Sequence, residues 1–513
     1  MTKITIPSSA AGTRLKDYLT ENGIKISAPC GGRGVCKKCL VKVVSGGFVA
    51  AVNGEELAPD ENGNILACQA VCTSGGAEIV ADEIAGDGLT CSGAAYEERE
   101  DNGAAYGIAL DIGTTTLASA LVNLESGKVA ATASCLNPQQ SYGADVISRI
   151  EAAKNGKLST MQSCLVKAVR GLIEKLVPND CEIKSLAAAG NTTMLHIFSG
   201  TSPVSMGAYP FTPVFTDART LDGSELGLNV GKVTLLPSVS AFVGGDITAG
   251  MYALKLGKSN VPTLLLDIGT NGEMVLDTGK ERGNRLISTS TAAGPALEGA
   301  NISCGMGGVA GAVSQVERGS SGELRYKTIG DTAARGICGC GLIDLCARLL
   351  EDETIDESGY LDGEFTLSGI HVTKSGEIDE GETAVTITQK DIREIQLAKS
   401  AIRAGIEALL DSAGMDVGSF VSSEGKVCIA GGLGYYLNPV SAAKIGLLPE
   451  EFVESNIVSA VGNTSLAGAC GALSDGTAIE QMSRTAKSCE SMELNRSSVF
   501  NDGFIEYMMF PEQ

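Results

Sequence analysis

Two segments of the chain, 156 residues apart, share one pattern: an apolar strand, the tetrapeptide Asp-Ile-Gly-Thr and a second strand. They are YGIALDIGTTTLASALV, which begins at residue 106, and PTLLLDIGTNGEMVLD, which begins at residue 262. A single copy could be an ordinary hairpin turn. Two copies at this separation indicate a duplicated strand–turn–strand unit. The repeat therefore constrains most of the chain to two similar halves.

The residues of the two turns suit phosphate binding. Gly113 and Gly269 allow the backbone to approach a ligand closely. Asp111 and Asp267 end their strands, where a carboxylate is placed to hold a hydrated Mg²⁺. Hydroxyl, amide and backbone donors for phosphate oxygens come from Thr114, Thr115, Thr270 and Asn271. We expect the two loops to face each other and to bind one polyphosphate from both sides.

A third glycine-rich turn lies in VCIAGGLGYYLNP, residues 427–439. An apolar strand there runs into Gly431, Gly432 and Gly434, whose missing side chains suit packing against an adenine and a ribose. The alternative is a glycine-capped turn without a ligand. Together with the two phosphate turns, this segment favours a nucleotide site.

Three cysteines lie within ten residues near the start of the chain. Cys30, Cys36 and Cys39 have the spacing C-x5-C-x2-C, and Cys68 and Cys72 follow in ILACQAVC. Four thiolates are the ligand set of a [2Fe–2S] cluster, and the glycines of the first loop allow the backbone to wrap it. A zinc ribbon favours two C-x2-C pairs, and only one is present. The pattern predicts a [2Fe–2S] cluster whose fourth ligand is Cys68 or Cys72.

The surroundings of these cysteines predict a β-grasp ferredoxin layout. Strand-like alternation covers residues 3–7, 40–46 and 75–84, and residues 13–22 are typical of a short helix. The five-residue gap after the first cysteine resembles adrenodoxin-like ferredoxins. That resemblance favours Cys68 as the fourth ligand, because ACQ is similar to their fourth-ligand segment.

The three glycine-rich turns, in this order, resemble the phosphate 1, phosphate 2 and adenosine motifs of the ASKHA superfamily, which includes actin, the Hsp70 ATPase and sugar kinases. The resemblance implies ATP as the ligand and connecting helices at residues 241–254 and 465–473. It also implies a catalytic role for Asp246, which stands where related ATPases present an acidic group to the attacking water. Asp111 and Asp267 complete the catalytic set.

The resulting fold class is an α+β β-grasp ferredoxin domain followed by an α/β ASKHA ATPase, an actin- and Hsp70-like duplicated RNase H-like fold. Residues 86–105 are glycine-rich and acidic and lack apolar periodicity, so they are typical of a linker. The expected boundaries are the ferredoxin domain 1–85, the linker 86–105, the first ASKHA subdomain 106–260, the second ASKHA subdomain 261–475 and a C-terminal tail 476–513.

The fusion of these two domains resembles the reductive activators of corrinoid proteins. Similar segments run along nearly the whole chain and include YGADVISRI, AAAGNTTMLHIFSG and AAGPALEGANISCGM. The resemblance implies ATP-dependent transfer of one electron to the inactive Co(II) corrinoid protein of a methyltransferase system, giving Co(I). It also implies an upstream low-potential electron donor. A homodimer is possible. Family members often carry a small middle domain, and we expect it to be missing here.

Two other functions remain open. One is an ASKHA activator of a radical enzyme of the 2-hydroxyacyl-CoA dehydratase type, which couples ATP to electron injection through a [4Fe–4S] cluster. The other is a small-molecule kinase with a redox sensor domain, which would transfer phosphate to an acceptor through an acidic base.

Charge and hydropathy limit the kinds of partner that this protein can bind and its location in the cell. Lys and Arg number 39 against 61 Asp and Glu, a net charge of −22, which disfavours nucleic acid because phosphate backbones bind clustered cations. No stretch approaches 18 apolar residues, and the first residues lack an apolar leader, so we expect a cytoplasmic protein off the membrane. Thiols in the cytoplasm are kept reduced, so Cys338, Cys340 and Cys346 are expected to pack in the core.

Overall fold

We describe the fold from a computed structural model, which describes residues 2–22, 24, 39–81, 105–177, 183–373, 376, 378–434 and 436–512. The expected linker 86–105, except its last residue, lies outside the described residues. Cys30 and Cys36 also lie outside them.

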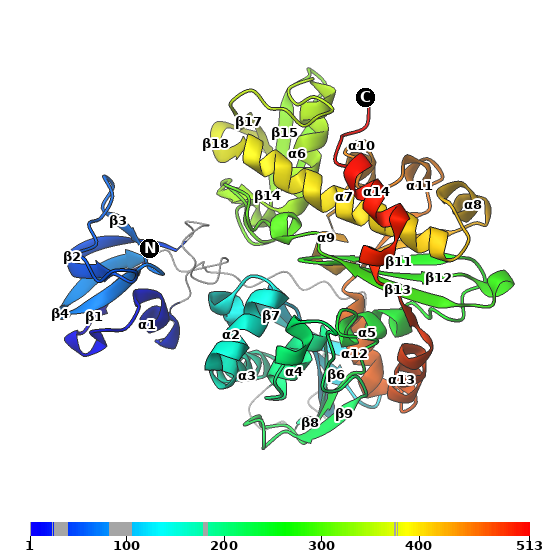
Figure 1. The fold of residues 1–513 in the computed structure, drawn as a ribbon, viewed down its shortest axis with the longest axis horizontal. Coiled ribbons are helices and arrows are strands. Elements are labelled where there is room, and N and C mark those ends of the chain that lie inside the picture. Colours follow the sequence, from blue (N-terminus) through cyan, green and yellow to red (C-terminus); the bar gives the residue numbers. More distant parts are fainter. Residues whose placement is uncertain are drawn as a thin grey trace.

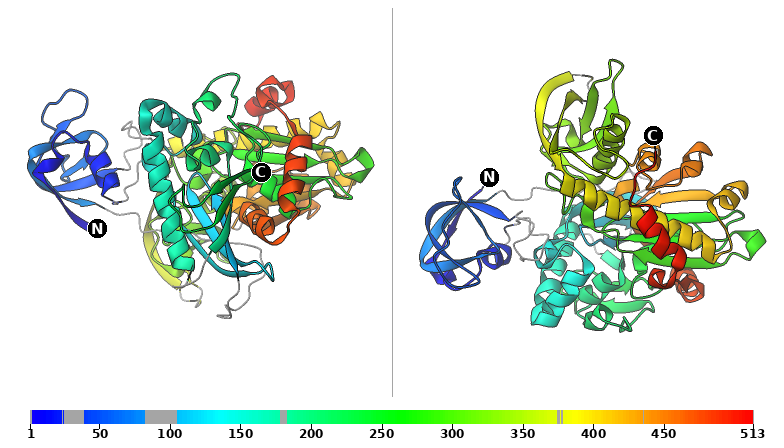
Figure 2. Two further views of the ribbon diagram at one scale, coloured as in Figure 1. Left: turned by 90° about the horizontal axis from the view of Figure 1, so that it is seen from below. Right: turned by 45° about the horizontal axis from the view of Figure 1, so that its top comes forward.

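A small four-stranded sheet forms the N-terminal domain, which stands beside a larger two-halved body (Figure 1). Figure 2 shows the same separation from two other directions. The strand order is β1-β4-β2-β3, and β1 and β2 both pair antiparallel with β4. The elements are β1 (Thr2–Ile6), α1 (Leu15–Glu21), β2 (Leu40–Ala50), β3 (Asn64–Leu66) and β4 (Ala70–Ala81).

Helix α1 lies on this sheet through one apolar face. Leu15 and Leu19 are four residues apart, so they share one side of the helix, and both are fully buried. Burying a leucine side chain contributes about 2 kcal/mol. They pack with Ile6, Phe48 and Ile79 of the sheet in one apolar cluster. This is the β-grasp ferredoxin layout that the sequence predicts.

The two repeated segments begin two sheets with the same core arrangement. The strand order is β7-β6-β5-β8-β10-β9 in the first sheet and β20-β19-β11-β12-β13-β21 in the second. In both, a central strand pairs antiparallel with the next strand of the chain and parallel with a later one. The strand order and pairing of the two sheets therefore show the duplicated ASKHA fold.

The first sheet and its helices come from residues 106–253. Its strands are β5 (Tyr106–Ile112), β6 (Thr116–Asn123), β7 (Val129–Leu136), β8 (Ile183–Gly190), β9 (Arg219–Asp222) and β10 (Lys232–Leu235). Its helices are α2 (Val146–Ala152), α3 (Leu158–Leu176), α4 (Thr192–Phe198) and α5 (Gly245–Ala253). His196 on α4 is fully buried and stacks on Phe215 with ring centroids 4.1 Å apart, so it has a packing role.

The second sheet recruits its strands from a longer stretch of chain. They are β11 (Thr263–Ile268), β12 (Gly272–Asp277), β13 (Leu286–Thr291), β19 (Lys426–Ala430), β20 (Val458–Gly462) and β21 (Glu490–Ser491). The helices of this stretch of chain are α7 (Gln389–Ser412), α8 (Val417–Ser422), α9 (Gly431–Gly434), α10 (Pro439–Lys444), α11 (Glu450–Glu454), α12 (Thr464–Ser474), α13 (Ala478–Ser488) and α14 (Ser498–Glu506). Of these, α12 packs on β5, β6 and β8 of the first sheet, and α13 packs on α5.

A five-stranded sheet with order β16-β14-β15-β17-β18 is inserted into the second half. The acidic stretch 351–383 supplies β17 and more than half of its antiparallel partner β18. The elements are β14 (Ala312–Arg318), β15 (Leu324–Thr328), β16 (Gly336–Ile337), α6 (Gly339–Glu351), β17 (Glu364–Val372) and β18 (Ile378–Thr388).

Helices α5 and α12 cross between the two sheets and correspond to the expected connecting helices. They approach closely because glycines face the crossing: a Cβ on Gly468 would lie 2.2 Å from the carbonyl oxygen of Ala249. A Cβ on Gly250 would lie 2.8 Å from Oγ1 of Thr464. Helix α5 begins four residues later than expected, because the extended residue Gly244 serves as its N-cap.

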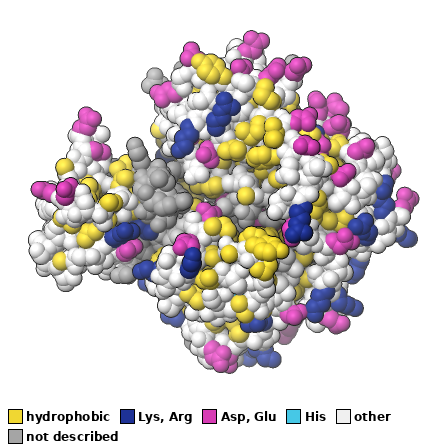
Figure 3. Space-filling view, viewed as in Figure 1, with side chains coloured by type: hydrophobic (Ala, Val, Ile, Leu, Met, Phe, Trp, Pro, Cys, Tyr) yellow, Lys and Arg dark blue, Asp and Glu magenta, His cyan; other side chains and the backbone are white. Residues whose placement is uncertain are grey.

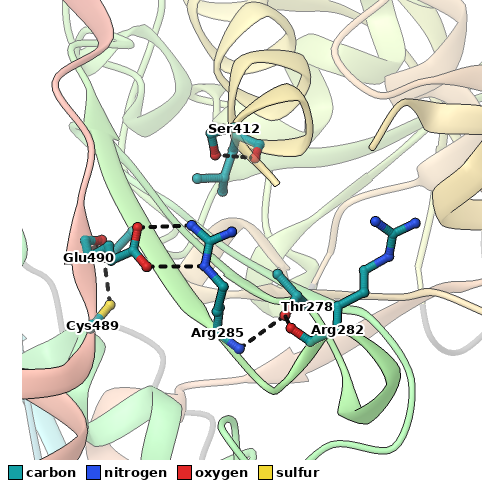
Figure 4. Close-up of polar contacts among 8 residues, drawn as sticks. Thr278, Arg282, Arg285, Ser412, Cys489 and Glu490 are labelled. Carbon is teal, nitrogen blue, oxygen red and sulfur yellow. Dashed lines mark hydrogen bonds and ion pairs between the residues drawn. The ribbon is translucent and has the colours of Figure 1, made fainter. Parts of the chain in front are cut away.

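The C-terminal residues fold back onto the second half. Strand β21 joins the edge of β13, and Figure 4 shows the adjacent pair of Arg285 and Glu490. Their two parallel contacts are Nε–Oε1 at 3.1 Å and Nη2–Oε2 at 3.0 Å. Both side chains are about half exposed, so the pair mainly fixes the strand register and adds little stability.

Charged side chains of both signs are spread over the surface. On the face in Figure 3, Lys and Arg are scattered among more numerous Asp and Glu and form no single basic patch. Within the described ranges, no helix has the combined length and apolar character that crossing a bilayer would require.

Candidate nucleotide and iron–sulfur sites

A cavity of about 260 Å³ lies where the two halves meet. The structure brings nearly all of the predicted nucleotide-site residues to its wall. They are Asp111, Gly113, Thr114, Thr115, Asp246, Asp267, Gly269, Thr270, Asn271, Gly431 and Gly432. Gly434 ends α9.

Five carboxylates line this wall, and strand register places three of them. Asp111 and Asp267 occupy equivalent positions on β5 and β11. Glu273 on β12 pairs directly with Asp267, where the first half has Ala118 opposite Asp111. Asp246 enters from the first turn of α5, and Glu298 lies on the short helical turn Pro295–Glu298. The strand pair of the second half therefore carries one acidic group more than the strand pair of the first.

Burial and mutual repulsion keep Asp246, Asp267 and Glu273 from ionising readily. Burial raises the pKa of Asp246 to about 8, and the charges of Asp267 and Asp111 raise it further. Burial raises the pKa of Asp267 to about 7, with added repulsion from Asp111 and Glu298. The pKa of Glu273 is raised by burial and by Asp246 and Asp267. Such a cluster is suited to binding a cation.

The residues fit a hydrated Mg²⁺ better than a bare metal ion. Among the described residues, no three His, Cys, Asp or Glu side chains converge as a direct metal site. Mg²⁺ in nucleotide sites keeps several waters and uses only one or two carboxylates together with the phosphates. Asp111 and Asp267 are placed to provide those carboxylates.

Two side chains at the start of α12 hold Asp111 in place. Nδ2 of Asn463 donates to Oδ2 of Asp111 at 2.8 Å, and the hydroxyl of Ser465 donates to Oδ1 at 2.7 Å. These two bonds partly offset the effect of burial, which raises the pKa of Asp111. Oδ1 of Asn463 also accepts from the backbone N–H of Leu466, so the same side chain caps α12.

Glu298 joins the two phosphate turns. Its Oε2 accepts a hydrogen bond from the hydroxyl of Thr115 at 2.7 Å and another from the hydroxyl of Thr270. Thr115 belongs to the first half and Thr270 to the second. Glu298 therefore connects the halves across the cavity.

The first phosphate turn is held by buried amide and guanidinium groups. Asn137 donates to the carbonyl oxygen of Gly113 at 2.8 Å, and Asn191 donates to Oγ1 of Thr114 at 3.1 Å. Arg149 is fully buried and donates to the carbonyl oxygen of Thr114. Burial lowers the pKa of Arg149 to about 10.

Glycine is required at two of the predicted positions. A Cβ on Gly113 would lie 2.5 Å from the carbonyl oxygen of Thr116. Gly431 has a φ of +81°, and a Cβ there would lie 2.6 Å from Oδ1 of Asp267. The adenosine turn therefore lies directly against the second phosphate loop.

The described part of the cysteine cluster is compact. Cys39 and Cys68 are both buried, and the N–H of Ala67 donates to the carbonyl oxygen of Cys39 at 2.9 Å. Cys72 instead lies on β4 opposite Phe48, and burial raises the pKa of its thiol. Two buried thiols on adjacent segments fit a [2Fe–2S] cluster.

Sequence reasoning missed the residues that support the loops. Glu298, Glu273, Asn191 and Asn463 carry no phosphate-loop pattern of their own. A local signal exists for two of them, because Asn191 and Asn463 stand directly before helices and are the N-caps of α4 and α12. Glu298 lies in the quoted segment AAGPALEGANISCGM, whose pattern alone gives it no role.

Three family models match consecutive parts of the chain. The 2Fe-2S iron-sulfur cluster binding domain matches residues 2–73, the RACo middle region matches 106–259, and the C-terminal domain of RACo, the ASKHA domain, matches 261–513. The expectation that the middle domain is missing is therefore wrong. It corresponds to the first half of the duplicated body.

Two named relatives align with most of this chain. The corrinoid activation enzyme RamQ of Eubacterium limosum is 35% identical over 391 residues, which cover 71% of this chain and 63% of RamQ. The match thus spans less than two thirds of that relative. The Co(II) methylated amine-specific corrinoid protein reductase of Methanosarcina barkeri is 26% identical over 436 residues, covering 78% of this chain and 76% of that protein.

One solved structure matches from end to end. A reductive activator for corrinoid, iron-sulfur protein superposes with a TM-score of 0.70 at 29% identity, covering 99% of this chain and 96% of that chain. The family models, the relatives and this structure agree with the ferredoxin sheet and the duplicated body. The chain belongs to the RACo family, which joins a [2Fe–2S] domain to an ASKHA domain.

Proposed function

We propose that this protein reactivates a corrinoid protein of a methyltransferase system by ATP-dependent transfer of one electron from a [2Fe–2S] cluster, which converts Co(II) to Co(I). One observation carries the proposal: a ferredoxin domain and an acidic nucleotide cavity occur in one chain whose relatives are named corrinoid activators. We further propose a cytoplasmic location and an upstream low-potential donor. The boundaries 1–85, 86–105, 106–260, 261–475 and 476–513 serve as working domain limits.

In this proposal, the two phosphate turns hold the triphosphate. Thr114, Thr115, Thr270 and Asn271 donate to phosphate oxygens, and Gly431 and Gly432 leave room for the adenosine. A Mg²⁺ ion, when bound, neutralises charge on the phosphates and on the surrounding carboxylates. Asp111 and Asp267 hold it through its waters, and Asn463 and Ser465 keep Asp111 oriented.

Asp246 is the proposed base for ATP hydrolysis. It stands at the start of α5, next to Asp267 and Asp111, and the N–H of Ile247 donates to its Oδ1 at 2.8 Å. Its free oxygen orients a water towards the γ-phosphorus. Attack on phosphorus breaks the bond to ADP, and the carboxylate accepts the proton of the water.

The Glu298 bridge offers a route from the nucleotide to the partner. Thr115 and Thr270 donate to Glu298 and are also proposed to bind phosphate, so a triphosphate competes for both hydroxyls. Their release from Glu298 changes how the two halves are joined. Differential binding of ATP and ADP to the two arrangements supplies at most several kcal/mol for the uphill electron transfer.

Cys30, Cys36, Cys39 and Cys68 are the proposed ligands of the cluster. The cluster, when bound, supplies one electron at a potential of roughly −400 mV if it is like plant ferredoxins. Burial of Cys39 and Cys68 shields the sulfurs from water. Cys72 is not proposed as a ligand, because its backbone pairs with Thr13 and Phe48, away from Cys39.

Two observations disfavour the other functions considered. A 2-hydroxyacyl-CoA dehydratase activator lacks an N-terminal ferredoxin domain, which residues 2–73 match here. A kinase with a sensor domain does not account for relatives named as corrinoid activators. The EPR spectrum of the reduced protein distinguishes a [2Fe–2S] from a [4Fe–4S] cluster.

The test incubates the reduced holoprotein with ATP and Mg²⁺, first with a panel of sugars and carboxylic acids and then with a Co(II) corrinoid protein. We expect release of inorganic phosphate to rise with the corrinoid protein and no small molecule to be phosphorylated. A phosphorylated acceptor that forms as fast as ATP disappears would overturn the proposal in favour of a kinase.

A further inference from the structure

Two thiols that the proposed function leaves unused lie in the wall of the cavity. Cys338 and Cys340 flank Gly339 at the start of α6 and are only 6% and 3% exposed. They are two residues apart, and each side chain shifts the pKa of the other thiol. In the described part of the chain, no third side chain makes a metal site with them. The pair is therefore a dithiol that faces the nucleotide cavity.

The two thiols differ in their surroundings. Cys338 is the N-cap residue of the 13-residue helix α6. The neighbouring side chain of Cys340 lowers the pKa of Cys338, and the amides of Gly341 and Cys340 lower it further. The same pairing raises the pKa of Cys340, together with burial. Cys338 is thus the better nucleophile and Cys340 carries the proton.

Cys340 is tied to the adenosine turn. Its Sγ donates to the carbonyl oxygen of Leu433 at 3.2 Å, and the N–H of Tyr436 donates to the sulfur. Leu433 lies on α9, directly after Gly431 and Gly432. The position of this turn therefore depends on the S–H group of Cys340.

The residue between the two cysteines packs against the Glu298 bridge. A Cβ on Gly339 would lie 1.8 Å from the carbonyl oxygen of Leu297, so the segment has no space to shift in that direction. Glu298, the next residue, accepts from Thr115 and Thr270. The dithiol thus contacts both the adenosine turn and the connection between the phosphate turns.

We propose that Cys338 and Cys340 are a modification site at which low-molecular-weight disulfides form an intramolecular disulfide that weakens nucleotide binding. The Cys338 thiolate attacks one sulfur of the small disulfide and releases a thiolate. Cys340 then attacks the Cys338 sulfur of the mixed disulfide and releases the second one. Two electrons pass from the protein to the small disulfide, whose two released thiolates take one proton from Cys340 and one from water and leave as two thiols.

Oxidation removes the S–H donor of Cys340 and leaves the carbonyl of Leu433 with the backbone N–H groups of Tyr436 and Leu437 as its donors. We expect the affinity for nucleotide to fall about tenfold, the most that the loss of one neutral hydrogen bond contributes. Because linkage is reciprocal, nucleotide then favours the dithiol over the disulfide by the same factor. For this two-electron couple, tenfold corresponds to a midpoint potential about 30 mV higher with nucleotide bound.

The inference rests on the proposed nucleotide site, so the experiment measures disulfide formation and nucleotide affinity separately. The holoprotein is treated with glutathione disulfide without oxygen, with and without saturating ADP and Mg²⁺. The disulfide is detected by mass spectrometry of the tryptic peptide 336–348. Because this peptide also contains Cys346, the assignment is made in a Cys346→Ala background. Affinity for ADP is measured by calorimetry before and after oxidation.

We expect a Cys338–Cys340 disulfide that forms less readily with ADP present, and about tenfold weaker ADP binding once it has formed. Cys340→Ser should make the affinity for ADP insensitive to glutathione disulfide, while Cys164→Ser, on α3 outside the cavity, should respond like the parent protein. Cys340→Ala should bind ADP more weakly than Cys340→Ser, because serine can still donate to Leu433.

Absence of the disulfide, or a disulfide that leaves ADP affinity unchanged, would overturn this inference. A reduced protein that binds no nucleotide would instead contradict the proposed function, since disulfide formation is scored by mass alone.

Discussion

The carboxylate of Asp111 accepts a hydrogen bond of 2.8 Å from the side chain of Asn463, which lies 352 residues later in the chain. Asp111 is the last residue but one of β5, a central strand of the first sheet, and Asn463 is the N-cap of α12, which follows β20 of the second sheet. One amide therefore connects the phosphate turn of one half to the connecting helix of the other. Displacement of that helix would move the carboxylate proposed to hold Mg²⁺.

Asn463→Ala should reduce ATP affinity and ATP turnover by about 10- to 100-fold, because a hydrogen bond to a buried charged group is lost. Equilibrium binding and phosphate release measure the two effects. Asn438→Ala is the matched control, since Asn438 also caps a helix but lies outside the cavity lining. Equal losses of ATP affinity and turnover in both variants would mean that Asn463 acts only as a helix cap.

Asp246→Asn should lower the rate of ATP hydrolysis by about 10²- to 10⁴-fold, as expected when a general base is removed. The amide has the same shape as the carboxylate, so ATP binding should persist. Single-turnover hydrolysis together with nucleotide binding measures both properties. Hydrolysis at the parent rate would exclude Asp246 as the base.

Asp267→Ala should abolish the ATP-dependent part of corrinoid reduction while the visible absorbance of the cluster stays intact. The reason is that Asp267 lies in the cavity of the duplicated body, separate from the ferredoxin sheet. Absorbance spectra and reduction assays on one preparation test this. Loss of cluster colour in this variant would contradict the assignment of the two sites to separate domains.

Cys39→Ser and Cys68→Ser should each bleach the protein after anaerobic reconstitution and leave nucleotide binding unchanged. Cys72→Ser should keep its colour, because Cys72 lies opposite Phe48 on β4 and not beside Cys39. Iron content and the visible spectrum give the result. A colourless Cys72→Ser protein beside a coloured Cys68→Ser protein would mean that Cys72, and not Cys68, is the fourth ligand of the cluster.

Lys399 gives a prediction on pH. Its Nζ donates to the carbonyl oxygens of Tyr507 and Met509, and burial lowers its pKa to about 7, with a smaller contribution from Arg403. The unfolded value is about 10.4, so between pH 7 and 10 the unfolded chain binds the extra proton. Lys399 should therefore contribute more to stability as pH rises through that window.

The measurement compares the Tm of the parent protein and of Lys399→Met at pH 7 and pH 9. The difference between the two should shift in favour of the parent protein at the higher pH. The methionine keeps the apolar stem, so packing of the C-terminal residues is similar in both. A difference that stays constant with pH would show that Lys399 remains charged in the folded protein.

The phosphate turns were predictable because their chemistry is local. An apolar strand, Asp, Gly and Thr occur within a few residues, and the repeat shows which turns belong together. Asn463 and Glu298 could not be found in this way, because their partners lie 352 and 183 residues away. Only packing of α12 on the first sheet brings Asn463 to Asp111.

Contacts between distant segments also explain why α5 begins later than expected and why Glu273 was not predicted as a site residue. The start of α5 depends on how Gly244 packs against Asn191, where a Cβ would lie 2.4 Å from the Cα of Asn191. Glu273 joins the acidic cluster only because of its register with Asp267. Periodicity alone cannot supply such contacts between distant segments.

The proposed function is tested most directly by mixing the reduced protein with a Co(II) corrinoid protein and following the visible spectrum for Co(I), with ATP, with ADP and without nucleotide. Co(I) should accumulate only with ATP, and about one cluster should be oxidised for each Co(I) formed. Equal Co(I) formation with and without ATP, or none at all with ATP and a reduced cluster, would contradict it.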